Sequence, residues 1–230
     1  MSDNKIINCR HCKFRSRAVE MLRDEELEEL SHSCSRLDLK AGTNILREKT
    51  PGTHIAYLQN GLAKVHKTGP KNTDQILKLI LPGYYVGIQT LLTRQTHLYS
   101  ATTLEPSSIC YIDINFFKRM LQVNASFAYE LITYISRDEL NYFERILSHN
   151  QKQVAGRLAD TLIYLADEVY KTDAFKLPLT RKDLAALVCS SRETVIRALF
   201  ELHNSKIITI EHKDITILSR NKLEQISRNG

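Results

Sequence analysis

The sequence has no long hydrophobic run. None of its apolar segments approaches the roughly 18 residues that a membrane helix needs, so a membrane protein is not expected. The first eight residues, Met1 to Asn8, lack the extended apolar core of a secretory signal peptide. We therefore expect a cytoplasmic protein.

Sequence motifs of the common enzyme classes are also absent. The chain has no G-x-S-x-G nucleophile motif, no phosphate-binding P-loop, no H-E-x-x-H zinc motif and no G-x-G-x-x-G dinucleotide motif. Its eight histidines are scattered, and we interpret His66, His97 and His149 as surface or partly buried residues. The sequence thus predicts a protein that is not an enzyme.

The composition is that of a globular protein with a basic surplus. Hydrophobic residues make up 43% of the chain and charged residues 25%, which leaves room for a sizeable core. The net charge of +6 and the pI near 9.0 favour an anionic partner such as nucleic acid, although many basic proteins bind none. The five cysteines are an odd number, which argues against a disulfide framework.

Short apolar runs alternate with glycine turns between Leu37 and Asp113. The runs at 55–58, 62–66 and 75–81 are typical of strands, and the Pro-Gly pairs at 51–52 and 82–83 are typical of turns. Many short strands with regular turns predict a sandwich or barrel. By itself, the pattern does not distinguish these from any other β domain.

A helical region follows, in which glycine is nearly absent from Asn115 to Lys171. Apolar residues recur every three or four positions, which predicts a long helix and then a second helix from Val154 to Tyr170. One stripe of the long helix would pack on the β domain and the other on a second subunit. A heptad-like spacing predicts that the homodimer interface is formed by Leu131, Ile135, Asp138, Tyr142 and Ile146. The alternative for Asp138 is a solvated position on the outer face.

The last sixty or so residues carry the signals of a helix-turn-helix. Thr180 is a good N-cap for a helix over 181–188, and Asp183 occupies the capping-box position. A break at Cys189-Ser190 precedes a second helix, which Ser191 opens. Two β-rich segments, 207–210 and 215–218, then flank residues 212–214 and predict a hairpin. The whole predicts a winged helix-turn-helix.

The second of these helices has the side chains that DNA reading requires. Arg192, Glu193 and Arg197 are long and polar; arginine can donate to guanine O6 and N7, and glutamate can accept from cytosine N4. Short hydroxyl side chains beside them suit phosphates, as does the start of the first helix. The predicted DNA-binding residues are Thr180, Arg181, Ser190, Ser191, Arg192, Glu193, Thr194 and Arg197.

Residues 191–197, S-R-E-T-V-I-R, resemble the S-R-E-T-V-x-R signature of the CRP/FNR superfamily, the cyclic-AMP receptor protein and fumarate-nitrate reductase regulator type. Residues 39–42 and 57–64 resemble the β-roll turns of that family, and residues 81–87 resemble its central glycine pair. Residues 151–166 resemble the segment that joins the dimer helix to the DNA domain. The likeness covers nearly the whole chain.

The resemblance implies an α+β fold in three parts. These are an N-terminal cyclic-nucleotide-binding-like β-roll (a double-stranded β-helix) over 1–124, a dimerisation helix over 125–150, and a winged helix-turn-helix over 151–230. It also implies a homodimer on a palindromic DNA site, with a G-A core in each half read by Glu193 and Arg197, and RNA polymerase as a partner. Cys189 departs from the glycine frequent in the family, and a positive φ there would cost about 1 kcal/mol.

The effector is not expected to be cyclic AMP. The family's cyclic-nucleotide binders have a Gly-Glu pair and an arginine before Ser or Thr, whereas here Gly87 precedes Ile88 and Gln89, and Tyr99 precedes Ser100. These five residues are the predicted effector pocket, for an effector that the sequence does not identify.

The cysteines leave several alternatives open. Cys9 and Cys12 resemble the C-x-x-C pair that holds an iron–sulfur cluster in the FNR branch, and Cys110 resembles its distant ligand. Ala18 stands where the third cysteine would be, and Cys34 lies too far along the chain to match without rearrangement. The alternatives are a cluster on Cys9, Cys12 and Cys110, a poorly spaced zinc site that includes Cys34 and His32, thiol chemistry, or a thiol pair in a mobile tail.

A different function remains a rival. A β-domain sensor could regulate through protein contacts alone, without binding DNA. The basic second helix of the helix-turn-helix argues against that interpretation, and binding to a palindromic duplex with a steep salt dependence distinguishes the two.

Overall fold

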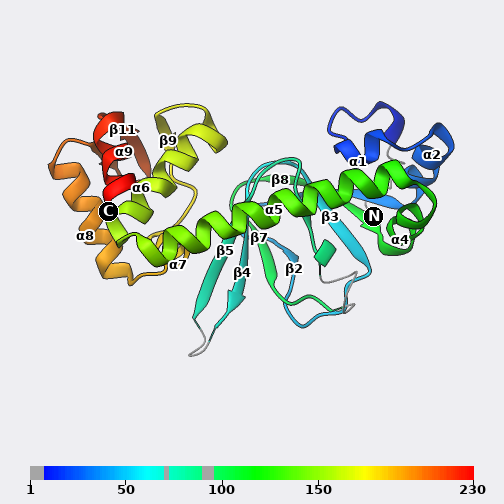
Figure 1. Ribbon diagram of the computed structural model, residues 1–230, viewed down its shortest axis with the longest axis horizontal. Coiled ribbons are helices and arrows are strands. Elements are labelled where there is room, and N and C mark those ends of the chain that lie inside the picture. Colours follow the sequence, from blue (N-terminus) through cyan, green and yellow to red (C-terminus); the bar gives the residue numbers. More distant parts are fainter. Residues whose placement is uncertain (1–7, 70–72, 90–95) are drawn as a thin grey trace. The chain divides into compact units, whose positions relative to one another are not determined.

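The computed structural model describes residues 8–69, 73–89 and 96–230. The chain divides into two compact units, the described parts of Met1–Asn72 with Leu77–Glu139, and Thr73–Ile76 with Leu140–Gly230. The division falls inside α5 (Ala125–Gln151), the long green helix of Figure 1. Among the described residues, no helix is long and apolar enough to cross a membrane.

The N-terminal unit is built on two antiparallel four-stranded sheets, with strand orders β1-β8-β3-β6 and β2-β7-β4-β5. Both sheets contribute to one apolar cluster that includes Leu58, Val65, Ile80 and Ile109, so the predicted β-roll is confirmed. The strands are β1 (Cys34–Leu39), β2 (Asn44–Leu46), β3 (His54–Asn60), β4 (Ala63–Thr68), β5 (Asp74–Ile80), β6 (Tyr85–Val86), β7 (Ser100–Thr103) and β8 (Ser107–Asp113).

The turn between β3 and β4 requires glycine. Gly61 has a φ of +97°, and a Cβ at this position would lie 2.6 Å from the Pro106 carbonyl oxygen. Any other side chain would both strain the backbone and collide with the start of β8. This is the turn that the β-roll resemblance pointed to.

Short helices close one side of this unit. They are η1 (Cys9–His11), α1 (Arg17–Glu20), α2 (Asp24–His32) and α4 (Ile114–Val123). Their apolar side chains form a second cluster with the start of α5, in which Phe117 and Phe127 pack edge to face at 5.2 Å. Asn124 separates α4 from α5, because its Oδ1 accepts from the Phe127 backbone N–H at 3.0 Å and caps the new helix.

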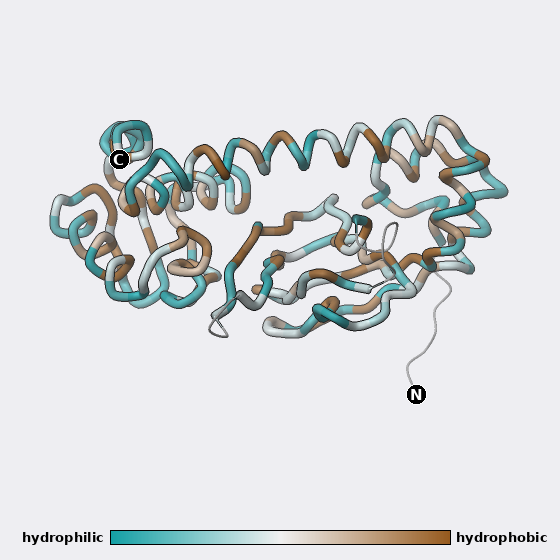
Figure 2. Tube along the Cα trace, turned by 60° about the horizontal axis from the view of Figure 1, so that its bottom comes forward, coloured by the Kyte–Doolittle hydropathy of each residue, from teal (hydrophilic) through white to brown (hydrophobic). Residues whose placement is uncertain are grey.

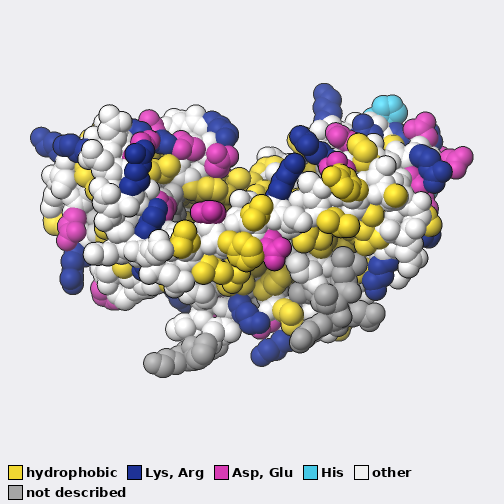
Figure 3. Space-filling view, in the orientation of Figure 1, with side chains coloured by type: hydrophobic (Ala, Val, Ile, Leu, Met, Phe, Trp, Pro, Cys, Tyr) yellow, Lys and Arg dark blue, Asp and Glu magenta, His cyan; other side chains and the backbone are white. Residues whose placement is uncertain are grey.

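Only part of the predicted interface on α5 is exposed. Leu131 is only 1% exposed and Ile135 packs against the same core, so Leu131 is not available to a second copy. Tyr142 and Ile146 are exposed as expected. The exposed stripe centres on Ile132, Leu140, Phe143 and Leu147. Hydrophobic positions recur along α5 in Figure 2, and Figure 3 shows hydrophobic side chains gathered over it.

Asp138 is paired within its own chain. Its carboxylate accepts from Lys78 Nζ of β5 at 2.5 and 2.7 Å, and both side chains are largely buried. Asp138 is therefore not solvated on the outer face, and its place in a dimer seam stays a prediction. The ion pair joins α5 to the sheet.

The C-terminal unit is a small helical domain with a three-stranded sheet of order β10-β11-β9. Buried leucines of α6, α7 and α8 form its core, with Leu158, Leu184 and Leu199 each at most 2% exposed. Its elements are α6 (Val154–Tyr164), a π-helix (Leu165–Tyr170), β9 (Ala174–Lys176), α7 (Arg181–Leu187), α8 (Arg192–Asn204), β10 (Ile208–Glu211), β11 (Asp214–Ile217) and α9 (Arg220–Asn229).

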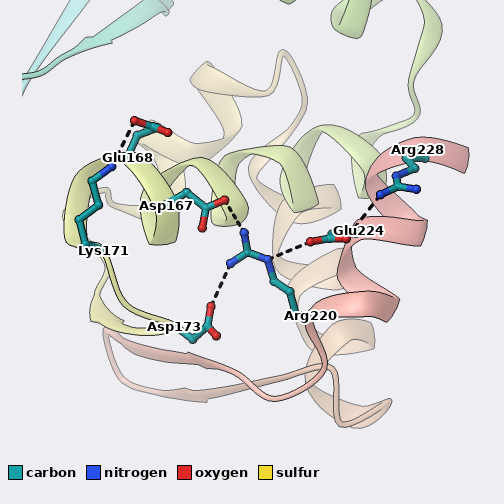
Figure 4. Close-up of polar contacts among 7 residues, drawn as sticks. All are labelled: Asp167, Glu168, Lys171, Asp173, Arg220, Glu224 and Arg228. Carbon is teal, nitrogen blue, oxygen red and sulfur yellow. Dashed lines mark hydrogen bonds and ion pairs between the residues drawn. The ribbon is translucent and has the colours of Figure 1, made fainter.

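One arginine connects three elements of this unit. Arg220, at the start of α9, donates to Asp173 at 3.0 Å, to Glu224 at 3.2 Å and also to Asp167 (Figure 4). The hydrogen bond to Asp167 is the main cause that holds the pKa of Arg220 above its usual value. The network fastens α9 to the π-helix and to the segment before β9.

Candidate nucleic-acid interface

The first helix of the predicted helix-turn-helix begins at a complete capping box. Thr180 Oγ1 accepts from the Asp183 backbone N–H at 3.1 Å, and Asp183 Oδ2 accepts from the Thr180 backbone N–H at 3.1 Å. Aspartate therefore does here what glutamate or glutamine usually does. Arg181 is half-buried, and burial lowers its pKa. The cap fixes where α7 begins.

The turn after α7 has the positive φ that the sequence analysis expected to be unfavourable for a residue other than glycine. Cys189 has a φ of +51°, and the Ser190 N–H donates to the Ala185 carbonyl oxygen at 2.9 Å. This is the 6→1 bond of a Schellman ending, for which glycine is the usual residue. Arg157 of α6, which the sequence analysis missed, donates through Nε to the Val188 carbonyl oxygen at 2.8 Å and holds the turn from behind.

The second helix, α8, presents its polar side to solvent. Ser191 caps it by accepting from the Thr194 N–H at 3.1 Å. Arg192, Glu193 and Arg197 are all exposed. The helix N-terminus holds the pKa of Glu193 below its usual value, because a backbone N–H and the Ser191 hydroxyl stabilise its charged form. A carboxylate acceptor and two guanidinium donors therefore share one exposed surface.

The opposite side of α8 is buried, as predicted for Ala198, Leu199 and Leu202. Val195 is fully buried with them. Ile196 and Phe200, by contrast, are 44% and 61% exposed and lie on the polar side, one turn apart. The sequence analysis missed both, although they follow Arg192 by four and by eight positions, which was a signal that they share its face.

The predicted wing is a β-hairpin. β10 and β11 pair antiparallel, with Ile208 opposite Ile217 and Glu211 opposite Asp214. His212 makes the turn with a φ of +56°. The hairpin is tied to α8, because the Ile210 N–H donates to His203 Nδ1 at 3.3 Å.

Three of the five predicted effector-pocket residues, Gly87, Gln89 and Tyr99, are joined by hydrogen bonds. The Gly87 N–H donates to Tyr99 Oη at 3.0 Å, and that hydroxyl donates to Gln89 Oε1 at 3.2 Å. Ile88 is fully buried, and Ser100 Oγ accepts from the Glu48 N–H at 3.0 Å. Burial raises the pKa of Tyr99 to about 12, so the phenol is neutral at pH 7. The Gly87 N–H is thus already hydrogen-bonded to a neutral phenol.

Four of the five cysteines influence one another, and Cys34 is among them. Cys9 Sγ lies 3.5 Å from Cys34 Sγ, and the charges of Cys12 and Cys9 contribute to a Cys110 pKa that burial raises to about 12. The hydrogen bond from Cys34 lowers the pKa of Cys9 to about 7. Still, the described residues contain no group of three or more Cys, His, Asp or Glu side chains placed to hold a metal ion.

Two family models match the chain, one over the β-roll and one over the helix-turn-helix. The cyclic nucleotide-binding domain matches residues 36–124, and the Crp-like helix-turn-helix domain matches residues 156–226.

Full-length relatives and solved structures match as well. Electron transport regulator A of Shewanella oneidensis is 23% identical over 97% of this chain and 92% of its own length. The anaerobic regulatory protein of Bacillus subtilis is 28% identical over 85% of this chain and 84% of its own length. The structure of FixK2 from Bradyrhizobium japonicum covers 84% of this chain and 96% of its own, with a TM-score of 0.75 and 20% identity.

These findings define the class. The chain is a transcription regulator with a cyclic-nucleotide-binding-like β-roll and a DNA-binding winged helix-turn-helix. Its relatives are regulators and not enzymes. Within that class, it belongs to the CRP/FNR superfamily.

The strained turn yields a stability prediction. We expect Cys189→Gly to raise the free energy of unfolding of the C-terminal unit by about 1 kcal/mol, because glycine adopts a positive φ without the Cβ penalty. Denaturant unfolding of the full chain, followed by circular dichroism, measures the change. Cys189→Ala is the matched control, since it removes the thiol and keeps the Cβ. Equal stabilisation by both substitutions would contradict the backbone explanation.

Proposed function

We propose that this chain is a cytoplasmic, sequence-specific regulator that binds a palindromic DNA site as a homodimer, with an effector sensed by the N-terminal unit. The observation that carries the proposal is that α8 buries one side and exposes the other. Val195 and Leu199 anchor the helix in the core, and Arg192, Glu193 and Arg197 consequently face solvent from its first turns. A recognition helix reads bases with those turns.

The chemistry of this surface suits a G·C pair in the major groove. An arginine fork matches guanine O6 and N7, and the ionised carboxylate of Glu193 accepts from cytosine N4. Hydroxyl groups around the turn and the half-buried guanidinium of Arg181 are assigned to phosphates, which position the helix without reading sequence. The proposed phosphate contacts are Thr180, Arg181, Ser190, Ser191 and Thr194.

The dimer is proposed to form along α5. Ile132, Leu140, Phe143 and Leu147 are 61%, 61%, 54% and 49% exposed. A continuous apolar stripe on one helix is what a coiled-coil-like seam with a second copy requires. A two-fold seam would present two copies of α8 to the two halves of a palindrome, and RNA polymerase is the proposed partner of the assembled complex.

For the effector, we propose redox sensing and not cyclic AMP. Tyr99 occupies the Gly87 amide, and the carboxylate and guanidinium that hold a cyclic nucleotide in the family are replaced by Gln89 and Tyr99. The names of the relatives, an electron transport regulator and an anaerobic regulatory protein, support a redox signal. The thiols of Cys9, Cys12 and Cys110 are the donors that an iron–sulfur cluster uses, but their placement does not fit a cluster.

Arg197→Ala tests the reading of bases. We expect it to cost about 1–3 kcal/mol on the cognate palindrome and to relax base preference at one position, because a bidentate contact is lost. In vitro selection from a random duplex library identifies the site, and fluorescence anisotropy gives the affinities. Arg228→Ala is the control, because that side chain is exposed on α9.

Two outcomes would contradict direct readout by Arg197. One is an equal loss of affinity for Arg197→Ala on the palindrome and on random DNA. The other is an affinity that does not fall with salt, which would favour a sensor that acts through protein contacts.

Phe143→Asp tests the dimer. We expect this variant to be monomeric at micromolar concentration, because it places a charge in the apolar seam; analytical ultracentrifugation measures the mass. Asn141→Asp is the matched control, since the same charge two positions away lies on nearly the opposite side of the helix and is exposed. A wild-type monomer, or a dimeric Phe143→Asp variant, would refute the proposed seam.

A further inference from the structure

The strongest unassigned feature is the contact between two thiols at the edge of the N-terminal core. Cys9 Sγ and Cys34 Sγ are 3.5 Å apart, across 25 positions of sequence. Cys9 is buried and Cys34 is half-buried at the start of β1. Since the cysteines do not form a metal-ligand group in the described structure, this pair requires a different explanation.

Both sulfurs are held on the same piece of structure. The Cys9 N–H donates to Ser31 Oγ of α2 at 3.0 Å, and Arg10 beside it donates to the Asp24 carbonyl oxygen at 3.0 Å. α2 ends at His32, directly before β1 begins at Cys34. The contact is therefore built by local hydrogen bonds and is not a chance approach of two mobile side chains.

We propose that Cys9 and Cys34 form a reversible disulfide, with a peroxide as the oxidant. One thiolate attacks a peroxide oxygen, the O–O bond breaks, and a sulfenic acid forms as hydroxide leaves and is protonated. The second sulfur attacks the sulfenic sulfur, the S–O bond breaks, and its oxygen leaves as water. Two thiols lose two electrons, hydrogen peroxide becomes two waters, and a thiol reductant reverses the bond. The sulfurs must approach to about 2.05 Å.

The test uses the reduced full-length chain and hydrogen peroxide. After treatment, remaining thiols are blocked with N-ethylmaleimide, and the digest is mapped by mass spectrometry. We expect one cross-linked peptide pair, Cys9 to Cys34, which dithiothreitol removes. Cys12→Ser and Cys110→Ser should keep that pair, and Cys34→Ser should lose it.

Three outcomes would overturn the disulfide. These are alkylation of Cys9 and Cys34 as readily after peroxide as before, a cross-link between Cys9 and Cys12 in its place, and anaerobically purified protein with bound iron that Cys34→Ser removes. The wild-type peptide map decides the question even where a variant does not fold. The proposal does not depend on DNA binding.

A second, independent observation concerns the exposed apolar residue within the polar surface of α8. Ile196 is 44% exposed, one turn after Arg192 and directly before Arg197. An isoleucine between two guanidinium groups that face DNA is suited to one feature of the major groove, the C5-methyl group of thymine. Phe200 lies a turn further along, away from the end of the helix that reads bases.

We infer that Ile196 selects thymine through that methyl group, an inference that rests on the proposed function. The test replaces each thymine of the selected palindrome by uracil, which lacks only the methyl. At one thymine of each half-site, the change to uracil should lower the affinity of wild-type protein about fourfold. That is the loss expected when one buried apolar group is removed. Ile196→Ala should bind both duplexes alike, and Arg228→Ala should discriminate like wild type.

Two results would overturn the role of Ile196. One is an Ile196→Ala variant that still binds the thymine duplex more tightly than the uracil duplex, and the other is wild-type protein that binds the two alike at every thymine. Failure of the proposed function looks different, because wild-type protein would then bind no palindrome at all.

Discussion

The proposed DNA-reading surface depends on the burial of one side of α8. Val195, Leu199 and Leu202 are each at most 4% exposed, so the helix cannot rotate about its axis without exposing them. Burying each such side chain is worth roughly 1.5–3 kcal/mol, more than any of the exposed polar residues can gain from a contact within the chain. The direction of Arg192 and Arg197 is therefore set by apolar residues that never approach DNA.

Polar contacts then fix the positions that burial leaves undetermined. The reciprocal cap between Thr180 and Asp183 sets the start of α7, and Arg157 holds the carbonyl at its end. Arg220 joins three acidic groups beneath the helices. These charges are satisfied inside the unit and serve as scaffold. The polar residues that open α8 instead face solvent. The charged side chains that stabilise the fold are thus distinct from those that are proposed to contact bases.

Local signals made the helix-turn-helix predictable from sequence, whereas contacts across long stretches of chain did not. The caps at Thr180 and Ser191 involve residues within a few positions of one another, so spacing alone reveals them, whereas the positive φ at Cys189 was expected only from the glycine frequent in the family. On α5 the periodicity predicted the helix, but it did not show that Leu131 is buried in the core while Tyr142 and Ile146 are exposed. Two apolar stripes run along that helix, and only the core decides that Leu131 belongs to the buried stripe. The partner of Asp138, a lysine sixty positions away, has no local signal.

Cys34 shows the same limit, with a consequence for regulation. Spacing along the chain left Cys34 outside the match to the cluster ligands and gave it only a poorly spaced zinc alternative, yet the fold brings it to Cys9. The cluster that contains Cys9 and Cys110 also contains Phe127 and Leu131, the residues that seat α5. Protein interiors are close-packed, so a bond that draws two sulfurs together by more than an ångström must be accommodated by its neighbours. Oxidation of this pair would act on the same core that seats α5, and so would connect a redox event to the helix that is proposed to form the dimer.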